Sequence, residues 1–326
     1  MNSLLEVGEQ LLMRDNYIIV GHSIPDGDCI GSILALYMGL KSKGKKVEMF
    51  LEDSVPSIYF YLANVDLIQQ ARENMPRVKN IIFLDCSDEQ RIGEVFYRWL
   101  PAAECWFNID HHKTNKGFGH YNYVDPRAAA TAEIVYDLLN TMKVEITAEM
   151  AAALYAGIVM DTGSFMNANT TSRTMQMAAK LIELGASVDE ARINLFESKP
   201  PEEVLLLGEA LRSIKFSEDG KIAWMILPLK VIESLNAQNY HPEGIINYTR
   251  MIKGVEVGML FRETAPSTIK IGFRSKGKID VARIAEYYGG GGHNQAAGAV
   301  QIGELEEISR KVVERVREVV QYWKAF

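Results

Sequence analysis

The stretch Tyr17-Ile-Ile-Val-Gly-His-Ser-Ile-Pro-Asp-Gly-Asp28 joins a continuous apolar run to a cluster of polar residues. Short apolar runs of this kind are typical of strands buried on both faces of a parallel sheet, or of packed helices when they are longer. An apolar run ends in an aspartate at three later places, which are Ile81–Asp85, Trp106–Asp110 and Ala153–Asp161. Because helical patterns such as Ile30–Lys43 alternate with these runs, we predict an α/β fold with a doubly wound parallel sheet.

Polar residues that follow neighbouring parallel strands meet in a crevice at the carboxyl edge of the sheet. The residues expected there are His22, Asp26, Asp28, Asp85, Asp110, His111, His112 and Asp161. Taken singly, Asp26-Gly-Asp28 is typical of a turn and Asp85 of a helix cap. Several carboxylates that lie close together cannot all stay ionised without compensation, and divalent cations provide it. The four clusters together therefore predict the two-metal site of a hydrolase.

The kinds of ligand in this set indicate which metal it prefers. Imidazole and carboxylate ligands together favour Mn²⁺ over Mg²⁺, because Mg²⁺ prefers oxygen ligands and keeps several waters. We therefore expect two divalent cations, with Mn²⁺ as the preferred ion. Co²⁺ or Fe²⁺ could replace it, and Mg²⁺ suits these ligands less well. Such a pair can activate a water for attack on phosphorus, which predicts phosphoester hydrolysis.

Four motifs of the chain resemble those of the DHH phosphoesterase superfamily. They are Gly21–Asp28 with Gly31-Ser32, Leu84-Asp-Cys-Ser-Asp88, Asp110-His-His112 and Asp161-Thr-Gly163. The run Gly289-Gly-Gly-Gly-His-Asn-Gln-Ala-Ala-Gly298 is similar to the signature of the associated DHHA1 domain. The two domains cover nearly the whole chain. Within the superfamily the chain most resembles the nanoRNase (oligoribonuclease) and pAp phosphatase branch, which degrades very short RNA and removes the 3′-phosphate of 3′-phosphoadenosine-5′-phosphate (pAp).

This resemblance implies a role for each residue of the clusters. One metal ion would be held by His22, Asp26 and Asp85, and the second by Asp28, Asp85, His111 and Asp161, with Asp85 bridging. Asp110 would orient a histidine from behind, as carboxylates commonly do for metal-bound imidazole. His112 would face the scissile phosphate and give a hydrogen bond or proton to the leaving oxygen. The expected catalytic residues are thus His112, Asp110 and Asp85.

A chain of 326 residues is longer than one hydrophobic core usually organises, so we expect two domains. Residues 1–190 form the predicted DHH domain and residues 191–205 a linker that contains the pair Pro200-Pro201. Residues 206–326 show hairpin and helix patterns typical of a smaller α+β domain, the DHHA1 domain. The active site would lie in the cleft between the two domains.

The glycine run has two interpretations. Consecutive glycines are often a flexible loop, but they also let backbone N–H groups approach a phosphate. We favour the second, which makes Gly291, Gly292, His293 and Asn294 substrate-binding residues. Arg262 and Arg274, each expected to end a strand at corresponding places of a hairpin, are further candidates, because a guanidinium suits phosphate; strand-end arginines are otherwise ordinary surface charges.

Net charge and cysteine content limit which substrates and which cellular location we expect. With a net charge of −7 and a pI near 5.5 the chain lacks the basic field that long duplex nucleic acid requires. We expect short single-stranded RNA of roughly two to five nucleotides, dinucleotides and pAp as substrates, and the resemblance implies a homodimer. Three cysteines without paired spacing, no signal pattern and no membrane-length apolar run predict a cytoplasmic protein without membrane contact.

Other functions remain open at this stage. A phosphodiesterase for cyclic dinucleotides or their product pApA would share both domains. The N-terminal motifs also resemble manganese-dependent inorganic pyrophosphatases, whose second domain lacks the signature of Gly289–Gly298. A nucleotide-binding regulator without turnover is a fourth alternative, against which the complete set of ligands argues. A metal-dependent turnover assay separates an enzyme from such a regulator.

Overall fold

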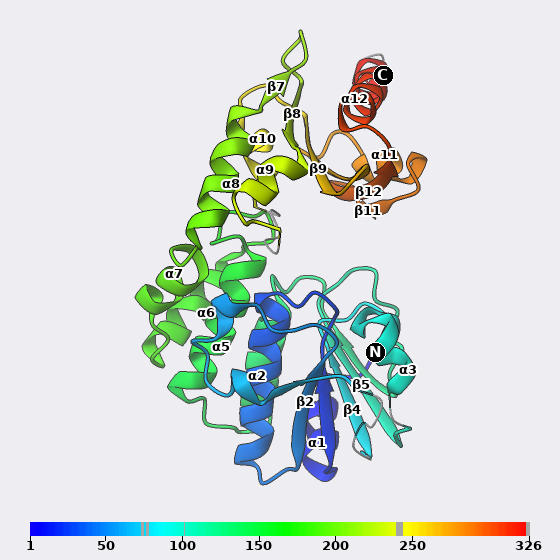
Figure 1. The fold of residues 1–326 in the computed structure, drawn as a ribbon. Coiled ribbons are helices and arrows are strands. Elements are labelled where there is room, and N and C mark those ends of the chain that lie inside the picture. The colour runs from blue at the N-terminus through cyan, green and yellow to red at the C-terminus, as the bar shows by residue number, and fades with distance from the viewer. Residues whose placement is uncertain (73–74, 76–77, 101, 239–243, 324–326) are drawn as a thin grey trace. The chain divides into compact units, whose positions relative to one another are not determined.

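Six parallel strands in the order β3-β2-β1-β4-β5-β6 form the central sheet of residues Met1–Ser198 (Figure 1). The structure is a computed structural model that describes residues 1–72, 75, 78–100, 102–238 and 244–323. The strands are β1 Tyr17–Val20, β2 Val47–Leu51, β3 Ile68–Gln70, β4 Asn80–Leu84, β5 Cys105–Asp110 and β6 Tyr121–Val124. The order 3-2-1-4-5-6 is that of a doubly wound sheet, which confirms the predicted fold of this domain.

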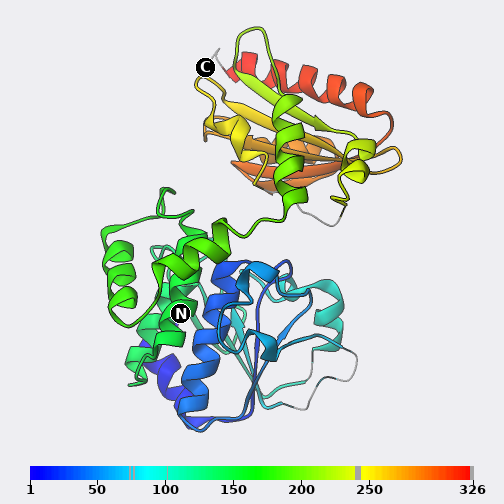
Figure 2. The same cartoon turned by 60° about the vertical axis from the view of Figure 1, so that its left-hand side comes forward.

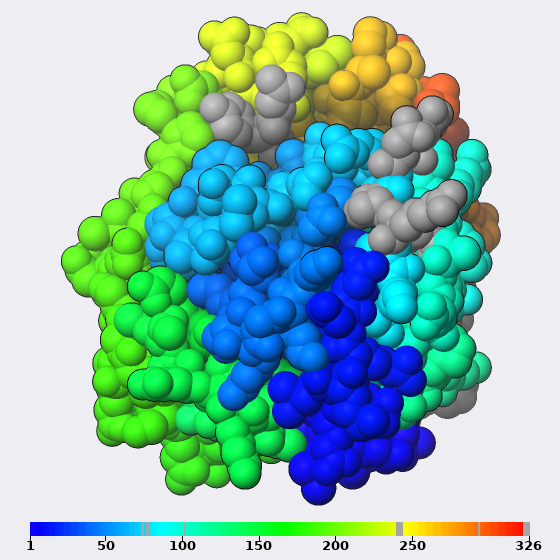
Figure 3. Space-filling model, turned by 90° about the horizontal axis from the view of Figure 1, so that it is seen from below, coloured from blue at the N-terminus to red at the C-terminus, as the bar shows by residue number. Residues whose placement is uncertain are grey.

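Helices cover both faces of this sheet. They are α1 Leu4–Met13, α2 Gly27–Ser42, α3 Glu94–Trp99, α4 Thr131–Thr141, α5 Ala148–Asp161, α6 Ser172–Glu183 and α7 Val188–Phe196, with short 3-10 turns at Ser57–Tyr59, Val65–Leu67 and Glu89–Ile92. Ile19 of β1 faces the larger core, which includes Ile33 of α2, whereas Ile18 faces a smaller core that includes Phe96 of α3. Figure 3 shows α1, in dark blue, on the surface of this unit.

The strand order reverses beside β1, because β2 pairs with one side of β1 and β4 with the other. Ligands of doubly wound sheets bind at the carboxyl ends of strands at such a reversal. The residues that follow β1, β4 and β5 therefore reach the same crevice. The sheet thus explains why residues far apart in the sequence can form one site.

Two helices, α2 and α5, lie so close together that backbone touches backbone. A Cβ atom at Gly31 of α2 would lie 2.2 Å from the carbonyl oxygen of Ala153 in α5. Such a distance is far inside van der Waals contact, so only glycine fits there. Asp28 lies in the first turn of α2 and Asp161 is the last residue of α5, so the two helices bring both carboxylates to the same end.

The two compact units are Met1–Ser198 and Lys199–Phe326. The segment 191–205, which we expected to be a linker, is largely helical, since it holds most of α7 and the first turns of α8, Pro201–Arg212. Pro200 is the N-cap of α8 and Pro201 its first residue, a position where a missing N–H costs nothing. The proline pair thus starts a helix at the unit boundary.

A mixed sheet with the order β11-β12-β10-β9-β8-β7 forms the second unit. Its strands are β7 Lys215–Phe216, β8 Ile222–Leu227, β9 Val257–Ala265, β10 Thr268–Ser275, β11 Gly291–His293 and β12 Ala296–Ile302. Its further helices are α9 Leu229–Ser234, α10 Asn247–Met251, α11 Val281–Tyr287 and α12 Leu305–Trp323. Figure 2 shows α12, in red, along one face of this sheet, whereas α8 packs with α9 in a separate core. The hairpins β7–β8 and β9–β10, together with these helices, confirm the expected α+β domain.

Half of the glycine run forms a strand, whereas Gly289 and Gly290 lie in the turn that precedes it. Gly291 and Gly292 lie in β11, an edge strand that pairs with β12. A Cβ atom at Gly292 would lie 2.6 Å from the carbonyl oxygen of Ala296, so this close turn requires glycine, and its φ of 145° does too. Within the described residues, no helix is both long and apolar enough to cross a bilayer.

Candidate active site

Three of the predicted ligands gather after β1 and β4. The Nε2 atom of His22 lies 3.4 Å from Oδ2 of Asp85 and 3.7 Å from Oδ1 of Asp26. Asp26 is also the N-cap of α2, because its Oδ1 accepts hydrogen bonds from the backbone N–H groups of Asp28 and Cys29. One ligand atom from each of His22, Asp26 and Asp85 falls within 4.8 Å of the others, which is close enough for one cation.

A second group forms beside the first, from the ends of β5, α2 and α5. The Nε2 atom of His111 lies 3.8 Å from Oδ2 of Asp161 and 3.9 Å from Oδ2 of Asp28. These three residues also offer ligand atoms within 4.8 Å of one another.

Asp85 stands between the two groups. Its Oδ2 faces His22 at 3.4 Å, while its Oδ1 faces His111 at 3.5 Å. The residue follows β4 in a left-handed conformation with a φ of 58°, which aspartate tolerates better than most residues do. The carboxylate thus has one oxygen toward each group, which is the arrangement that a bridging ligand requires.

The backbone fixes the ring orientation of two histidines. Nδ1 of His22 lies 2.9 Å from the carbonyl oxygen of Ser23, and Nδ1 of His111 lies 3.3 Å from that of Ala128. A carbonyl oxygen only accepts hydrogen bonds, so each Nδ1 carries a proton and each Nε2 is directed at the carboxylates. A hydrogen bond on the far nitrogen is the usual support of a metal-binding imidazole.

The third histidine is held differently. Nδ1 of His112 lies 2.7 Å from Oδ1 of Asp110, which is fully buried. The amide of Asn115 holds that carboxylate in turn, by donating to its Oδ2 at 2.7 Å, and also donates to Oδ1 of Asn108. His112 itself is about one-third exposed, so its Nε2 remains available to a substrate.

Two residues that we did not predict also position the carboxylates. Oγ1 of Thr131, the first residue of α4, donates to Oδ1 of Asp85 at 2.9 Å. Nδ2 of Asn169 contacts Oδ2 of Asp161 and the carbonyl oxygen of Ala129. Neither residue belongs to a cluster of acids and histidines, so no pattern in the sequence pointed to them.

Asp28 is bound to the protein at both of its oxygens. Oδ2 accepts from the N–H of Thr131 at 2.6 Å, and Oδ1 accepts from the N–H of Ala132 at 2.8 Å and from the hydroxyl of Ser32. The carboxylate thereby satisfies the first N–H groups of α4, where a negative charge is favourable. Asp28 is therefore both a ligand candidate and the link between two helices.

Burial and charge shift the pKa values of the site. Burial and the charges of Asp85 and Asp161 hold the pKa of Asp28 well above its usual range. Burial, partly offset by His111, raises the pKa of Asp161 to about 6. Burial opposes protonation of His22, but its hydrogen bonds to Asp26 and Asp85 outweigh this and raise its pKa to about 11. Without a cation, the cluster thus holds extra protons to limit repulsion between its carboxylates.

The donor set fits divalent cations. It combines imidazole nitrogens, whose far sides are hydrogen-bonded, with carboxylates whose mutual repulsion a positive ion would relieve. His22, Asp26 and Asp85 could hold one ion, and Asp28, Asp85, His111 and Asp161 another. The acidic and histidine cluster therefore indicates divalent cations as the cofactor of this site.

The arginines predicted to bind substrate lie far apart along one ladder. Arg262 pairs with Lys270 and Arg274 with Gly258, so they are at opposite ends of β9–β10 rather than at corresponding places. The expectation failed because β9 and β10 are antiparallel, so their C-terminal ends lie at opposite ends of the ladder; Arg262 also lies inside β9, which runs on to Ala265. Arg262 is buried, and one of its N–H groups donates to the carbonyl oxygen of Gln238.

Arg274, by contrast, lies next to the glycine-rich hairpin. It pairs with Ala296, which pairs with His293 across the β11–β12 turn. Asn294 lies in that turn, and with its amide nitrogen toward Asp280 it donates to Oδ1 at 3.0 Å. The side chain of His293 lies outside the described residues. The structure thus brings the backbone of residues 291–294 and Arg274 to one corner of the second unit.

Both parts of the chain match known families. Residues 16–158 match the N-terminal domain of the DHH family, and residues 229–320 match the DHHA1 domain. The bifunctional oligoribonuclease and PAP phosphatase NrnA of Thermus thermophilus is 35% identical over 301 residues, which are 92% of this chain and 89% of that protein. The protein of the same name from Bacillus subtilis is 28% identical over 90% of this chain and 92% of its own length.

A solved structure agrees with these matches. The crystal structure of an exopolyphosphatase-related protein from Bacteroides fragilis superposes with a TM-score of 0.91 at 26% identity, over 99% of this chain and 97% of that one. The relatives confirm the resemblance to the nanoRNase and pAp phosphatase branch that the motifs indicated. The chain therefore belongs to the DHH phosphoesterase family, as an enzyme whose second unit is a DHHA1 domain.

Proposed function

We propose that this enzyme hydrolyses oligoribonucleotides of roughly two to five nucleotides to mononucleotides and pAp to AMP, with two divalent cations, most often Mn²⁺, in its site. The observation that carries the proposal is the placement of Asp85, with one carboxylate oxygen toward His22 and the other toward His111. The names of the relatives from Thermus thermophilus and Bacillus subtilis support the choice of substrates.

The protein's own residues would prepare the site in three ways. His22 and His111 present Nε2 because carbonyl oxygens hold their Nδ1 protons. Thr131 fixes the rotation of the Asp85 carboxylate through a hydrogen bond to Oδ1. Two divalent cations bound there would lower the pKa of a water and neutralise charge on the phosphate. Imidazole and carboxylate ligands together favour Mn²⁺ over Mg²⁺ for this role.

His112 would act on the leaving group. Burial opposes its protonation, but the hydrogen bond to Asp110 outweighs burial and raises the pKa of His112. Its imidazole can therefore carry a proton near neutral pH, with Nδ1–H on Asp110 and Nε2–H toward the substrate. Donation of the Nε2 proton to the leaving oxygen would assist cleavage of the P–O bond.

The corner formed by residues 291–294 and Arg274 would bind a phosphate or base that is not cleaved. Gly291 has no side chain, and a Cβ atom there would meet nothing within 4 Å, so the backbone of the edge strand β11 is open at this residue. Arg274 supplies a cation at the same corner. Arg262 and His293 remain predictions as substrate contacts. A net charge of −7 fits substrates with few phosphates better than a long duplex.

The test is release of AMP from pAp and from pApA, side by side, with Mn²⁺ and with EDTA. Wild-type protein is compared with Asp85→Ala and with Asp66→Ala, a matched loss of an exposed carboxylate outside the cluster. We expect wild type and Asp66→Ala to hydrolyse both substrates only with Mn²⁺. Asp85→Ala should lose orders of magnitude in rate, because it removes the ligand placed between both groups.

Two results would contradict the proposal. Near-normal turnover by Asp85→Ala would show that the cluster is not the active site. No hydrolysis of either substrate by folded, Mn²⁺-loaded wild type would exclude these substrates, and pyrophosphate or a role in binding alone would then be tested instead.

A further inference from the structure

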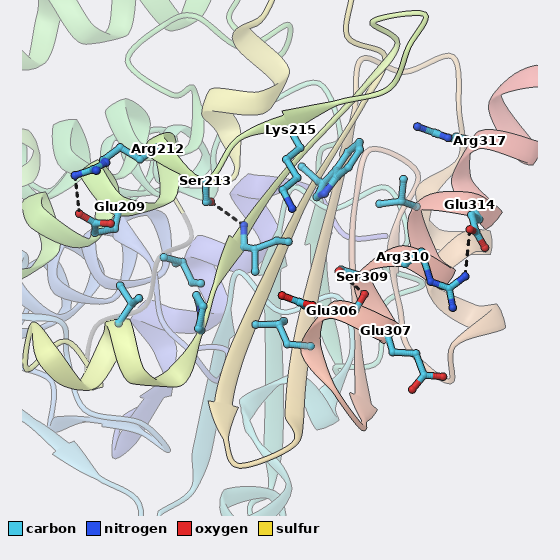
Figure 4. A pocket seen from close by; sticks show the side chains of 17 residues that line it. Glu209, Arg212, Ser213, Lys215, Glu306, Glu307, Ser309, Arg310, Glu314 and Arg317 are labelled. Atoms are coloured by element: carbon cyan, nitrogen blue, oxygen red, sulfur yellow. Dashed lines mark hydrogen bonds and ion pairs between the residues drawn. The ribbon is translucent and has the colours of Figure 1, made fainter.

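The second unit contains a cavity of about 830 Å³ that the proposed chemistry does not use (Figure 4). It lies between the end of α8, the strands β7 and β8, α9 and the part of α12 from Leu305 to Arg317. Its volume falls within the range of small-molecule pockets, about 300–1,000 Å³. The strands β7 and β8 are at one edge of the mixed sheet and β11 is at the other, so this cavity is distinct from the glycine-rich corner.

The floor of the cavity is apolar and includes a flat aromatic ring. Trp224 and Ile226 of β8 line it, together with Val313 of α12. Trp224 is half-buried, so part of its indole remains open to the cavity. An indole that is packed on one side and open on the other is a platform on which a planar ring can stack.

Two cationic side chains also line the cavity. Lys215 is the cross-strand partner of Trp224, and Arg317 approaches from α12. In the described part of the chain, neither forms an ion pair, and Nε of Arg317 is buried without a hydrogen-bond partner.

The charged residues of the cavity make one end positive and the other negative. Arg212 is paired with Glu209 at 3.6 Å, and Arg310 with Glu314 at 3.4 Å. In the view of Figure 4, Lys215 and Arg317 lie toward one end, and Glu306 and Glu307 toward the other. An anionic group would therefore be attracted to the end with Lys215 and Arg317 and repelled from the opposite end.

We propose that this cavity is a second ligand site, which binds a nucleoside monophosphate. The base would stack on Trp224, and the phosphate would lie between Lys215 and Arg317. A planar ring joined to a dianion is the ligand that matches a ring platform flanked by two cations. The site is independent of the aspartate and histidine cluster of the first unit, since every residue that lines it belongs to the second unit.

The test uses AMP as the probe and the full chain in EDTA, with binding measured by calorimetry. The site variant is Lys215→Glu with Arg317→Gln. The matched control is Lys253→Glu with Arg250→Gln, which makes the same charge changes at an exposed and a partly exposed position of the same unit outside the cavity. Trp224→Phe identifies the indole N–H resonance of Trp224 in the proton–nitrogen NMR spectrum of wild type.

We expect wild type and the control to bind AMP equally, with a shift of the Trp224 resonance, and the site variant to bind at least tenfold more weakly. Asp85→Ala should bind as wild type does, because the metal cluster is elsewhere. Absence of binding by wild type at millimolar AMP would overturn the proposal. So would equal binding by the site variant, or loss of binding in Asp85→Ala, which would place AMP at the catalytic cluster.

Discussion

Replacement of Asp161 by asparagine should stabilise the metal-free protein while it weakens metal binding. Burial is the largest cause that raises the pKa of this carboxyl from 3.8 to about 6, and the charge of Asp85 adds to it. A shift of about two units corresponds to roughly 3 kcal/mol of unfavourable free energy for the ionised form at neutral pH. Since the side chain is 27% exposed, we expect asparagine to recover about 2–3 kcal/mol.

The dependence on pH identifies the cause. Between pH 3.8 and about 6 the folded protein keeps a proton on Asp161 that the unfolded chain releases, so the stability that this group contributes falls as pH rises. An asparagine at this position cannot ionise and avoids this loss. Below pH 3.8 the variant and wild type should therefore have the same free energy of unfolding. From pH 3.8 to about 6 the variant should become progressively more stable than wild type, and above that pH the difference in stability should stay constant.

The assay is urea unfolding in EDTA at several pH values from 3.5 to about 8. Asp66→Asn, at an exposed position, serves as the control and should change little. The amide of asparagine still offers Asn169 an oxygen, so the local hydrogen bond can persist. In Mn²⁺ titrations the same Asp161→Asn protein should bind more weakly. The reasoning is refuted if the metal-free variant is no more stable than wild type, or if its advantage is the same at pH 3.5 and pH 7.5.

Three further predictions concern the residues around the cluster. Thr131→Val should cost about 1–2 kcal/mol of unfolding free energy and weaken Mn²⁺ binding, because Asp85 loses a buried hydrogen-bond donor. Thr131→Ser should restore both the stability and the binding. Unchanged urea and Mn²⁺ titrations of Thr131→Val would contradict this. Asn115→Ala should lower kcat about tenfold with KM little changed, since the carboxylate behind His112 is released; a change in KM alone would argue against it. Mn²⁺ binding should release protons and weaken from pH 8 to pH 6, because His22, with a pKa near 11, must lose a proton before it can bind the ion. Calorimetry in buffers of different ionisation enthalpy measures the number of protons released. Equal affinity at both pH values would disprove the prediction.

The sequence predicted well where the strands β1, β4 and β5 of the first sheet end. Residues such as His22 and Asp85 follow apolar runs, and in a parallel sheet these positions converge whatever the loops between them do. The contribution of Thr131 was not predictable in the same way. It bonds Asp28 across 103 positions of the sequence and is itself the first residue of a helix, so no spacing rule connects the two.

The second unit was predicted less well. Arg262 and Arg274 were expected at matching places, although the C-terminal ends of the two antiparallel strands of a hairpin lie at opposite ends of the ladder, as they do in β9 and β10. Glycines have low strand propensity, yet Gly291 and Gly292 form an edge strand, because pairing with β12 decides their conformation. Long-range pairing of this kind is set by tertiary structure rather than by local preference.

The close contact between α2 and α5 sets the distance between two carboxylates of the candidate metal site. Asp28 and Asp161 extend from two helices whose backbones meet at Gly31 and Ala153, with no adjustable side chain between them. A side chain at Gly31 would push the helices apart and lengthen the gap between the two carboxylates. The size of the ion that this cluster prefers could therefore be retuned from a position that never touches an ion.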